Sequence, residues 1–108
     1  MIVYRDTLIS SLSTSIPEFD IDPDWIEGPL GYPLINDLAR FALKQIATGN
    51  TNAIERIGAF LEGALQSEDG YLEDLVLEFL DNLRTCDKAV AVIAPHFGQQ
   101  TRSLWEAR

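Results

Sequence analysis

The sequence predicts an all-α protein: a compact antiparallel helical bundle or αα-hairpin stack of about five to six helices. Apolar residues recur every three or four positions in several successive segments, which is the spacing of one helix face. Short stretches rich in Gly, Pro, Asn or Ser separate these segments, and short turns favour antiparallel neighbours. The one apolar run that also fits a strand has no second convincing strand to pair with.

The chain of 108 residues is expected to form one helical domain spanning 1–108. Apolar residues make up 46% and charged residues 23%, which is typical of a globular protein. The N-terminus lacks the basic and apolar blocks of a secretory signal, and no apolar run approaches the roughly 18 residues of a membrane span. Cys86 is the single cysteine, so no intramolecular disulfide is possible. We therefore expect a soluble, cytoplasmic protein.

The first helix is expected over residues 3–15, where apolar side chains follow helical spacing. Pro17 ends it, because proline cannot continue a helix. Residues 18–31 are expected to form an irregular acidic loop, since they contain two prolines and two glycines. Loops that mix aromatic side chains with charge often carry function.

The clearest helix is expected over residues 32–48, and the Gly-Asn pair at 49–50 is a good stop signal. Thr51 or Asn52 is expected to cap the following helix. That helix ends before a turn at residues 67–70.

A further helix is expected over residues 71–83. The run 88–94 fits either a short buried helix or a strand, and we favour a helix because a strand would have no partner. Residues 99–107 are expected to form a last short helix, with Leu104 and Trp105 docking on the core.

Acidic charge dominates two long stretches of the chain. The formal net charge is -9, and residues 6–39 and 57–83 each contain seven acidic residues and no Lys or Arg. A field of one sign repels nucleic acid and anionic membranes, and it attracts basic partners. The charge therefore argues against a nucleic acid or a membrane as partner and favours a basic protein.

Several acidic residues of the 71–83 helix are spaced so that they share one face of the helix. Asp74, Glu78 and Asp81 fall at i, i+4 and i+7 on one face, with Glu73 alongside. Like charges at this spacing destabilise a helix by about 0.2–0.5 kcal/mol per pair. Two interpretations stay open: a merely solvated face, or an anionic surface that is complementary to a basic partner.

The acidic loop contains Trp25. Tryptophan is enriched in the energetic centres of interfaces, but it is also a common core residue. Because Trp25 lies between acidic residues in an irregular segment, we expect it at an interface. The predicted partner-binding set combines the loop with the 71–83 helix: Asp22, Asp24, Trp25, Glu27, Glu73, Asp74, Glu78 and Asp81.

The alternating acids Asp20, Asp22 and Asp24 invite comparison with a calcium-binding loop. An EF-hand loop starting at the first of them requires Gly at its sixth position and Glu at its twelfth. Trp25 and Gly31 stand at those positions. We therefore expect a solvated acidic loop and no metal site.

Catalytic signals are weak. His96 is the only histidine, and no nucleophile motif accompanies it, so a loop or surface histidine is expected. Arg84 and Lys88 lie near Cys86 in the sequence, which favours a reactive thiol, but a buried inert cysteine is the better interpretation. No Gly-rich phosphate loop is present. We expect no catalytic and no cofactor-binding residues, and we do not expect the protein to be an enzyme.

Three segments resemble a group of short acidic bacterial proteins: Gly-Tyr-Pro-Leu-Ile-Asn-Asp-Leu-Ala-Arg-Phe (31–41), Phe-Leu-Asp-Asn-Leu (79–83) and Phe-Gly-Gln-Gln-Thr-Arg-Ser-Leu-Trp (97–105). This group comprises small helical immunity-type proteins encoded beside secreted toxins, including contact-dependent growth inhibition systems. The resemblance implies an all-α fold, a cytoplasmic location and a cognate toxin as partner. It implies no particular functional residues, and the first thirty residues have no counterpart in it.

The sequence therefore leads to an immunity protein that neutralises a toxin domain through an acidic surface. A nuclease is the natural target, because its substrate cleft must be basic to hold phosphates. The alternative is a helical adaptor with a basic partner that is not a toxin.

Overall fold

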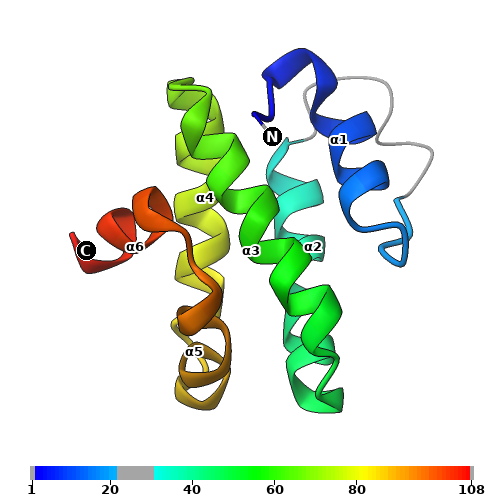
Figure 1. Cartoon of the computed structure of the whole chain (residues 1–108), viewed down its shortest axis with the longest axis vertical. Helices are drawn as coiled ribbons and strands as arrows, with labels where there is room; N and C mark the ends of the chain where they lie inside the picture. The colour runs from blue at the N-terminus through cyan, green and yellow to red at the C-terminus, as the bar shows by residue number, and fades with distance from the viewer. Residues whose placement is uncertain (1, 22–30, 108) are drawn as a thin grey trace.

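Three long helices form the middle of the molecule and run in alternating directions along its longest axis (Figure 1). The computed structural model describes residues 2–21 and 31–107. Its helices are η1 (Arg5–Thr7), α1 (Leu8–Ser15), α2 (Gly31–Thr48), α3 (Thr51–Gln66), α4 (Gly70–Leu83), α5 (Asp87–Ile93), η3 (Ala94–His96) and α6 (Gln99–Glu106). No described residue lies in a strand, so the predicted all-α bundle of about six helices is confirmed.

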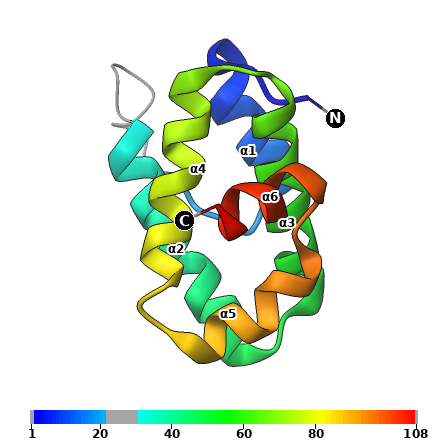
Figure 2. The ribbon, with the colours of Figure 1, turned by 90° about the vertical axis from the view of Figure 1, so that its left-hand side faces the viewer.

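The shorter helices surround the three long ones. Helix α1 packs on one side of α3 and α6 on the other, while α5 lies at the end of the bundle where α4 finishes (Figures 1 and 2). The ambiguous run 88–94 is almost entirely helical, as favoured from the sequence. None of the helices in the described part of the chain is long and apolar enough to cross a membrane.

The turn between α2 and α3 follows local chemistry. Gly49 has a φ of +74°, a left-handed conformation that glycine adopts without steric cost. The side chain of Asn50 accepts a hydrogen bond from the backbone N–H of Ala53 at 3.3 Å and so caps α3. The prediction of Thr51 or Asn52 as the cap was wrong by one or two residues, because Asn50 stays outside the helix and is free to fold back onto it.

The N-terminal segment departs from the expected helix over residues 3–15. Val3 is fully buried, and its backbone N–H donates to the carbonyl of Gly63 in α3 at 2.9 Å. The chain is extended at Tyr4 and becomes α-helical only at Leu8. Anchoring to α3 therefore replaces the first turn of the predicted helix, a tertiary contact that helical spacing alone does not reveal.

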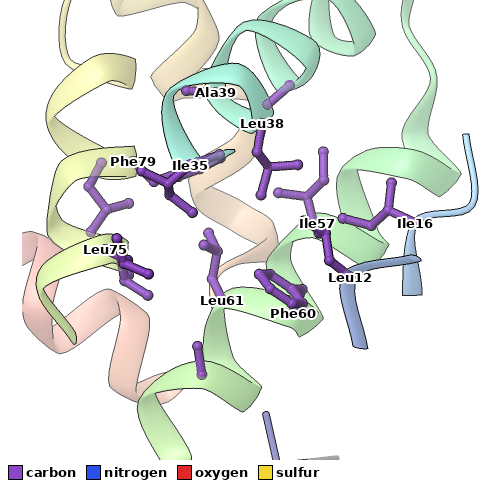
Figure 3. Packing of buried hydrophobic residues seen from close by; sticks show 14 of the residues in the cluster. Leu12, Ile16, Ile35, Leu38, Ala39, Ile57, Phe60, Leu61, Leu75 and Phe79 are labelled. Carbon is purple, nitrogen blue, oxygen red and sulfur yellow. The ribbon is translucent and has the colours of Figure 1, made fainter. Parts of the chain in front are cut away.

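The core lies between α1, α2, α3 and α4 (Figure 3). Phe60 of α3 and Phe79 of α4 are among its largest fully buried side chains. Burying apolar surface at about 25 cal/mol per Å² supplies the main stabilisation of such a bundle. The labelled members in the figure are Leu12, Ile16, Ile35, Leu38, Ala39, Ile57, Phe60, Leu61, Leu75 and Phe79.

The C-terminal helix docks as expected through Leu104 and Trp105, both partly buried against the core. The Trp105 ring packs against Phe97 with ring centroids 5.7 Å apart. The guanidinium of Arg84 also lies over this ring, 3.7 Å from its centroid. Arg84 also donates a hydrogen bond to the Trp105 carbonyl at 2.7 Å, so one side chain holds both the ring and the end of α6.

Candidate protein-binding surface

The predicted acidic row on α4 faces outward. The buried residues of α4 are Leu72, Leu75, Val76, Phe79, Leu80 and Leu83, and they share the opposite face. Asp74 is exposed, and Glu78 and Asp81 are partly exposed. We call these three residues the α4 row. Asp81 lies 3.9 Å from Arg84, while in the described part of the chain Asp74 and Glu78 make no ion pair.

Glu73 does not belong to the α4 row. It lies one residue before Asp74, and a step of about 100° around the helix turns it towards α6. There it lines a groove between the end of α3, the start of α4 and α6. The sequence therefore assigned Glu73 to the right helix, but the structure separates it from the other three acids.

This groove, the α6 groove, is an open hollow of about 710 Å³. Figure 2 looks onto this side of the molecule, with α6 lying across α3 and α4. Carboxylates stand on the α3–α4 side, amide and hydroxyl groups on the α6 side, and leucines on both helical walls. The lining residues are Leu65, Glu68, Asp69, Glu73, Gln99, Gln100, Ser103, Leu104 and Ala107.

Glu62 of α3 fixes the α6 wall of the groove. Its carboxylate accepts hydrogen bonds from the backbone N–H groups of Gln100 and Thr101 at 3.1 and 2.9 Å. It also accepts one from the Thr101 hydroxyl at 3.0 Å. These donors lie at the N-terminus of α6, where a negative charge is favoured. A Cβ on Gly98 would approach the Glu62 carboxylate to 2.5 Å, so the absence of a side chain there permits the contact.

Asp69 is already engaged at the rim of the groove. It caps α4 by accepting from the Tyr71 N–H at 2.9 Å, and Arg5 donates to both of its oxygens at 3.0 and 2.6 Å. These hydrogen bonds hold the pKa of the Asp69 carboxyl below its usual value. The Arg5 guanidinium also lies 4.8 Å from the centre of the Tyr71 ring. A guanidinium held by a carboxylate and an aromatic ring is therefore present within the chain itself.

Glu68 and Glu73 have no such partner. Within residues 2–21 and 31–107, neither carboxylate makes an ion pair or accepts a hydrogen bond. Glu68 also has a φ of 58°, just after the end of α3, where glycine or asparagine is favoured. The groove thus combines two unneutralised charges with apolar surface on a wall that is fixed in place.

The loop half of the predicted surface lies outside the described residues. Asp22, Asp24, Trp25 and Glu27 all fall there, so their prediction stays untested. In the part of the chain that is described, no group of three His, Cys, Asp or Glu side chains is arranged to hold a metal ion. Asp20 is exposed and lines a separate hollow of about 490 Å³.

His96 and Cys86 lie apart from the groove lining. His96 is partly buried and lines a hollow of about 320 Å³ near Glu55 and Glu62, and its carbonyl lies where a Cβ on Gly58 would approach to 2.4 Å. Cys86 is partly exposed at the start of α5, so the expectation of a buried cysteine was wrong. It is the N-cap residue, directly before the first turn of α5.

The α6 groove is not predicted by the sequence. The rim residues Glu68 and Asp69 belong to the acidic stretch 57–83 but not to the predicted partner-binding set, and neither do the α6 residues Gln99, Gln100 and Ser103. The groove exists because Glu62 and Thr101, far apart in the chain, come together. The spacing of residues along the sequence does not predict that contact.

The comparisons with known proteins give one match. A family model described as a domain of unknown function, DUF7674, matches residues 7–108. No curated protein and no solved structure matches the chain. The family description makes no statement about toxins, so the resemblance of 31–41, 79–83 and 97–105 to immunity-type proteins stays a prediction.

Proposed function

The chain belongs to the DUF7674 family, and from its acidic surface we propose that it is an immunity protein that binds and neutralises a cognate toxin domain. The observation that carries the proposal is the α4 row beside the α6 groove. Asp74, Glu78, Glu68 and Glu73 have no cationic partner among the described residues, on a chain of net charge -9. Charges left without a partner in the free protein are available to a partner in a complex.

Stability gives little reason for Asp74 and Glu78 of the α4 row. Asp74 and Glu78 are four residues apart, and such a like-charge pair costs about 0.2–0.5 kcal/mol. The positive end of the helix dipole favours Glu73 in the first turn, but its effect fades before Glu78. A Lys at one of these positions would form a favourable pair instead. This cost supports a role in binding.

A nuclease domain is the toxin class that fits best. A nuclease must present a basic cleft to hold phosphates, and an acidic surface can occupy that cleft or cover its entrance. Opposite fields also speed capture, towards roughly 10⁸–10⁹ M⁻¹s⁻¹ at low salt. Such a toxin acts on nucleic acid in the cytoplasm, so the proposal places the immunity protein there as well.

Co-expression with the product of the adjacent upstream gene tests the proposal. We expect the two proteins to purify as one complex and the toxic activity to disappear. The paired variant Asp74→Asn, Glu78→Gln should weaken the complex, since it removes two charges from the α4 row. The control Asp6→Asn, Glu55→Gln removes two exposed charges elsewhere and should leave affinity unchanged. No complex and no protection would reject the proposal, whereas a complex with a basic protein that is not a toxin would favour the adaptor alternative.

A further inference from the structure

The α6 groove has a composition that differs from the solvated acidic face of α4. Leu65 of α3 and Leu104 of α6 contribute apolar surface, and both are only partly buried. Glu68 and Glu73 stand on one side, and Ser103 on the other. Apolar surface next to unneutralised carboxylates suits a side chain that has an aliphatic stem and a cationic head.

We infer that the α6 groove binds an arginine side chain presented by a basic segment of the protein partner. The identity of that partner rests on the proposed function, but the recognition chemistry does not. The aliphatic part of the arginine lies along Leu65 and Leu104, and the guanidinium donates hydrogen bonds to the Glu68 and Glu73 carboxylates. The Ser103 hydroxyl and the side-chain carbonyls of Gln99 and Gln100 offer further acceptors on the α6 side.

Arginine fits this groove better than lysine for a geometric reason. A guanidinium carries five N–H donors in a plane and can bond to groups on two sides at once, whereas an ammonium is a compact point charge. The chain already binds one guanidinium nearby, since Arg5 donates to both oxygens of Asp69 and lies against the Tyr71 ring. That pair occupies Asp69 and leaves Glu68 and Glu73 for an incoming arginine.

The groove is preformed, which lowers the cost of binding. Three hydrogen bonds to Glu62 hold the N-terminus of α6, and Arg84 holds its C-terminal end through Trp105. Because the helix is held at both ends, its backbone needs no ordering when a ligand arrives, and only side chains lose conformational entropy. The affinity of the groove for a single arginine side chain can therefore be measured with a short peptide, without the rest of the partner.

A titration monitored by NMR tests this inference on the full chain. The probe is a capped tripeptide with a central arginine, and the control probe replaces arginine by citrulline, which has nearly the same shape and no charge. We expect saturable shifts of the backbone amides of Leu65, Ser103 and Leu104 with the arginine probe. We expect none of comparable size with citrulline. A lysine probe that binds as tightly as arginine would overturn the assignment to arginine.

Variants separate the groove from general electrostatic attraction. Glu68→Gln with Glu73→Gln should weaken the arginine probe roughly tenfold, since two ion pairs are lost. Asp6→Asn with Glu55→Gln removes the same charge from exposed positions outside the groove and should leave binding within about twofold. Equal weakening by both pairs, or shifts spread evenly along α4, would overturn the inference.

A third variant blocks the groove without removing a carboxylate. Ser103→Arg places a guanidinium on the exposed side of α6, within the groove lining, and should abolish binding of the probe. Circular dichroism of each variant checks that the fold is retained. Because the titration contains no toxin, it can succeed when the co-expression experiment fails. In that case the assignment of the groove as an arginine site is supported, and the proposal of an immunity protein is rejected.

Discussion

Replacing Glu62 with alanine should loosen the N-terminus of α6 from the bundle. The carboxylate accepts hydrogen bonds from two backbone N–H groups and from the hydroxyl of Thr101, which is fully buried. Losing a helix cap costs about 1 kcal/mol, and leaving a buried polar group without a partner costs about 1–3 kcal/mol. Solvent reaches the partly exposed Glu62 site and reduces the second cost, so we expect a loss of about 2 kcal/mol.

Thermal unfolding followed by circular dichroism measures this loss. In a domain of roughly this size, 1 kcal/mol lowers Tm by about 4–8 °C, so Glu62→Ala should lower Tm by roughly 10 °C. Hydrogen exchange should show faster exchange in α6 than in α2 or α3, because the lost contacts belong to α6.

Glu55→Ala is the matched control for this experiment. Glu55 is exposed on the same helix and makes no hydrogen bond within the described residues, so its removal should change stability by less than about 0.5 kcal/mol. If Glu62→Ala and Glu55→Ala have the same Tm, Glu62 does not hold α6. The description of a fixed groove wall would then be wrong.

Three further predictions concern charge, pH and backbone. Glu78→Lys with Asp81→Lys should weaken the toxin complex while circular dichroism stays native, and unchanged affinity would reject the α4 row as contact surface. Because Arg5 lowers the pKa of Asp69, the ion pair stabilises the fold above the ordinary carboxyl pKa, and this stabilisation is lost as the pH falls through the lowered pKa. In Arg5→Met, the free energy of unfolding should therefore fall less steeply between roughly pH 5 and pH 2, as measured by urea unfolding at a series of pH values. Gly49→Ala should cost about 1 kcal/mol in urea unfolding, since an alanine at a φ of +74° is strained.

Gly70 is the matched control for the backbone prediction. It begins α4 without a positive φ, and a Cβ built there meets nothing within 4 Å. Gly70→Ala should therefore be neutral or slightly stabilising. Equal losses at Gly49 and Gly70 would contradict the assignment of strain to the turn after α2.

Much of the fold was predictable because helix formation is a local property. Apolar spacing located α2, α3, α4 and α6, and the lack of a strand partner decided the 88–94 run correctly. The errors occur where a tertiary contact or a single cap decides the outcome. Val3 leaves the helical pattern to bond to Gly63, and Asn50 caps α3 in place of the residues that follow it.

The site was predictable only in part for the same reason. Asp74, Glu78 and Asp81 share a face because helix geometry fixes the i, i+4 and i+7 positions. The α6 groove depends on α6 docking across α3 and α4, and on which acids already have partners. Arg5 neutralises Asp69 although the two residues are 64 positions apart in the sequence, while Glu68 and Glu73 remain available. Which carboxylates have a cationic partner depends on the fold and cannot be deduced from the charges in the sequence.

The role of the acidic surface is tested by isothermal titration of this protein with the purified product of the adjacent upstream gene, the proposed toxin, at low and at high salt. We expect a tight one-to-one complex at low salt whose affinity falls markedly at high salt, because unneutralised carboxylates meet a basic surface. Absence of binding, or an affinity that does not change with salt, would contradict recognition through the acidic surface of α4 and the groove beside it.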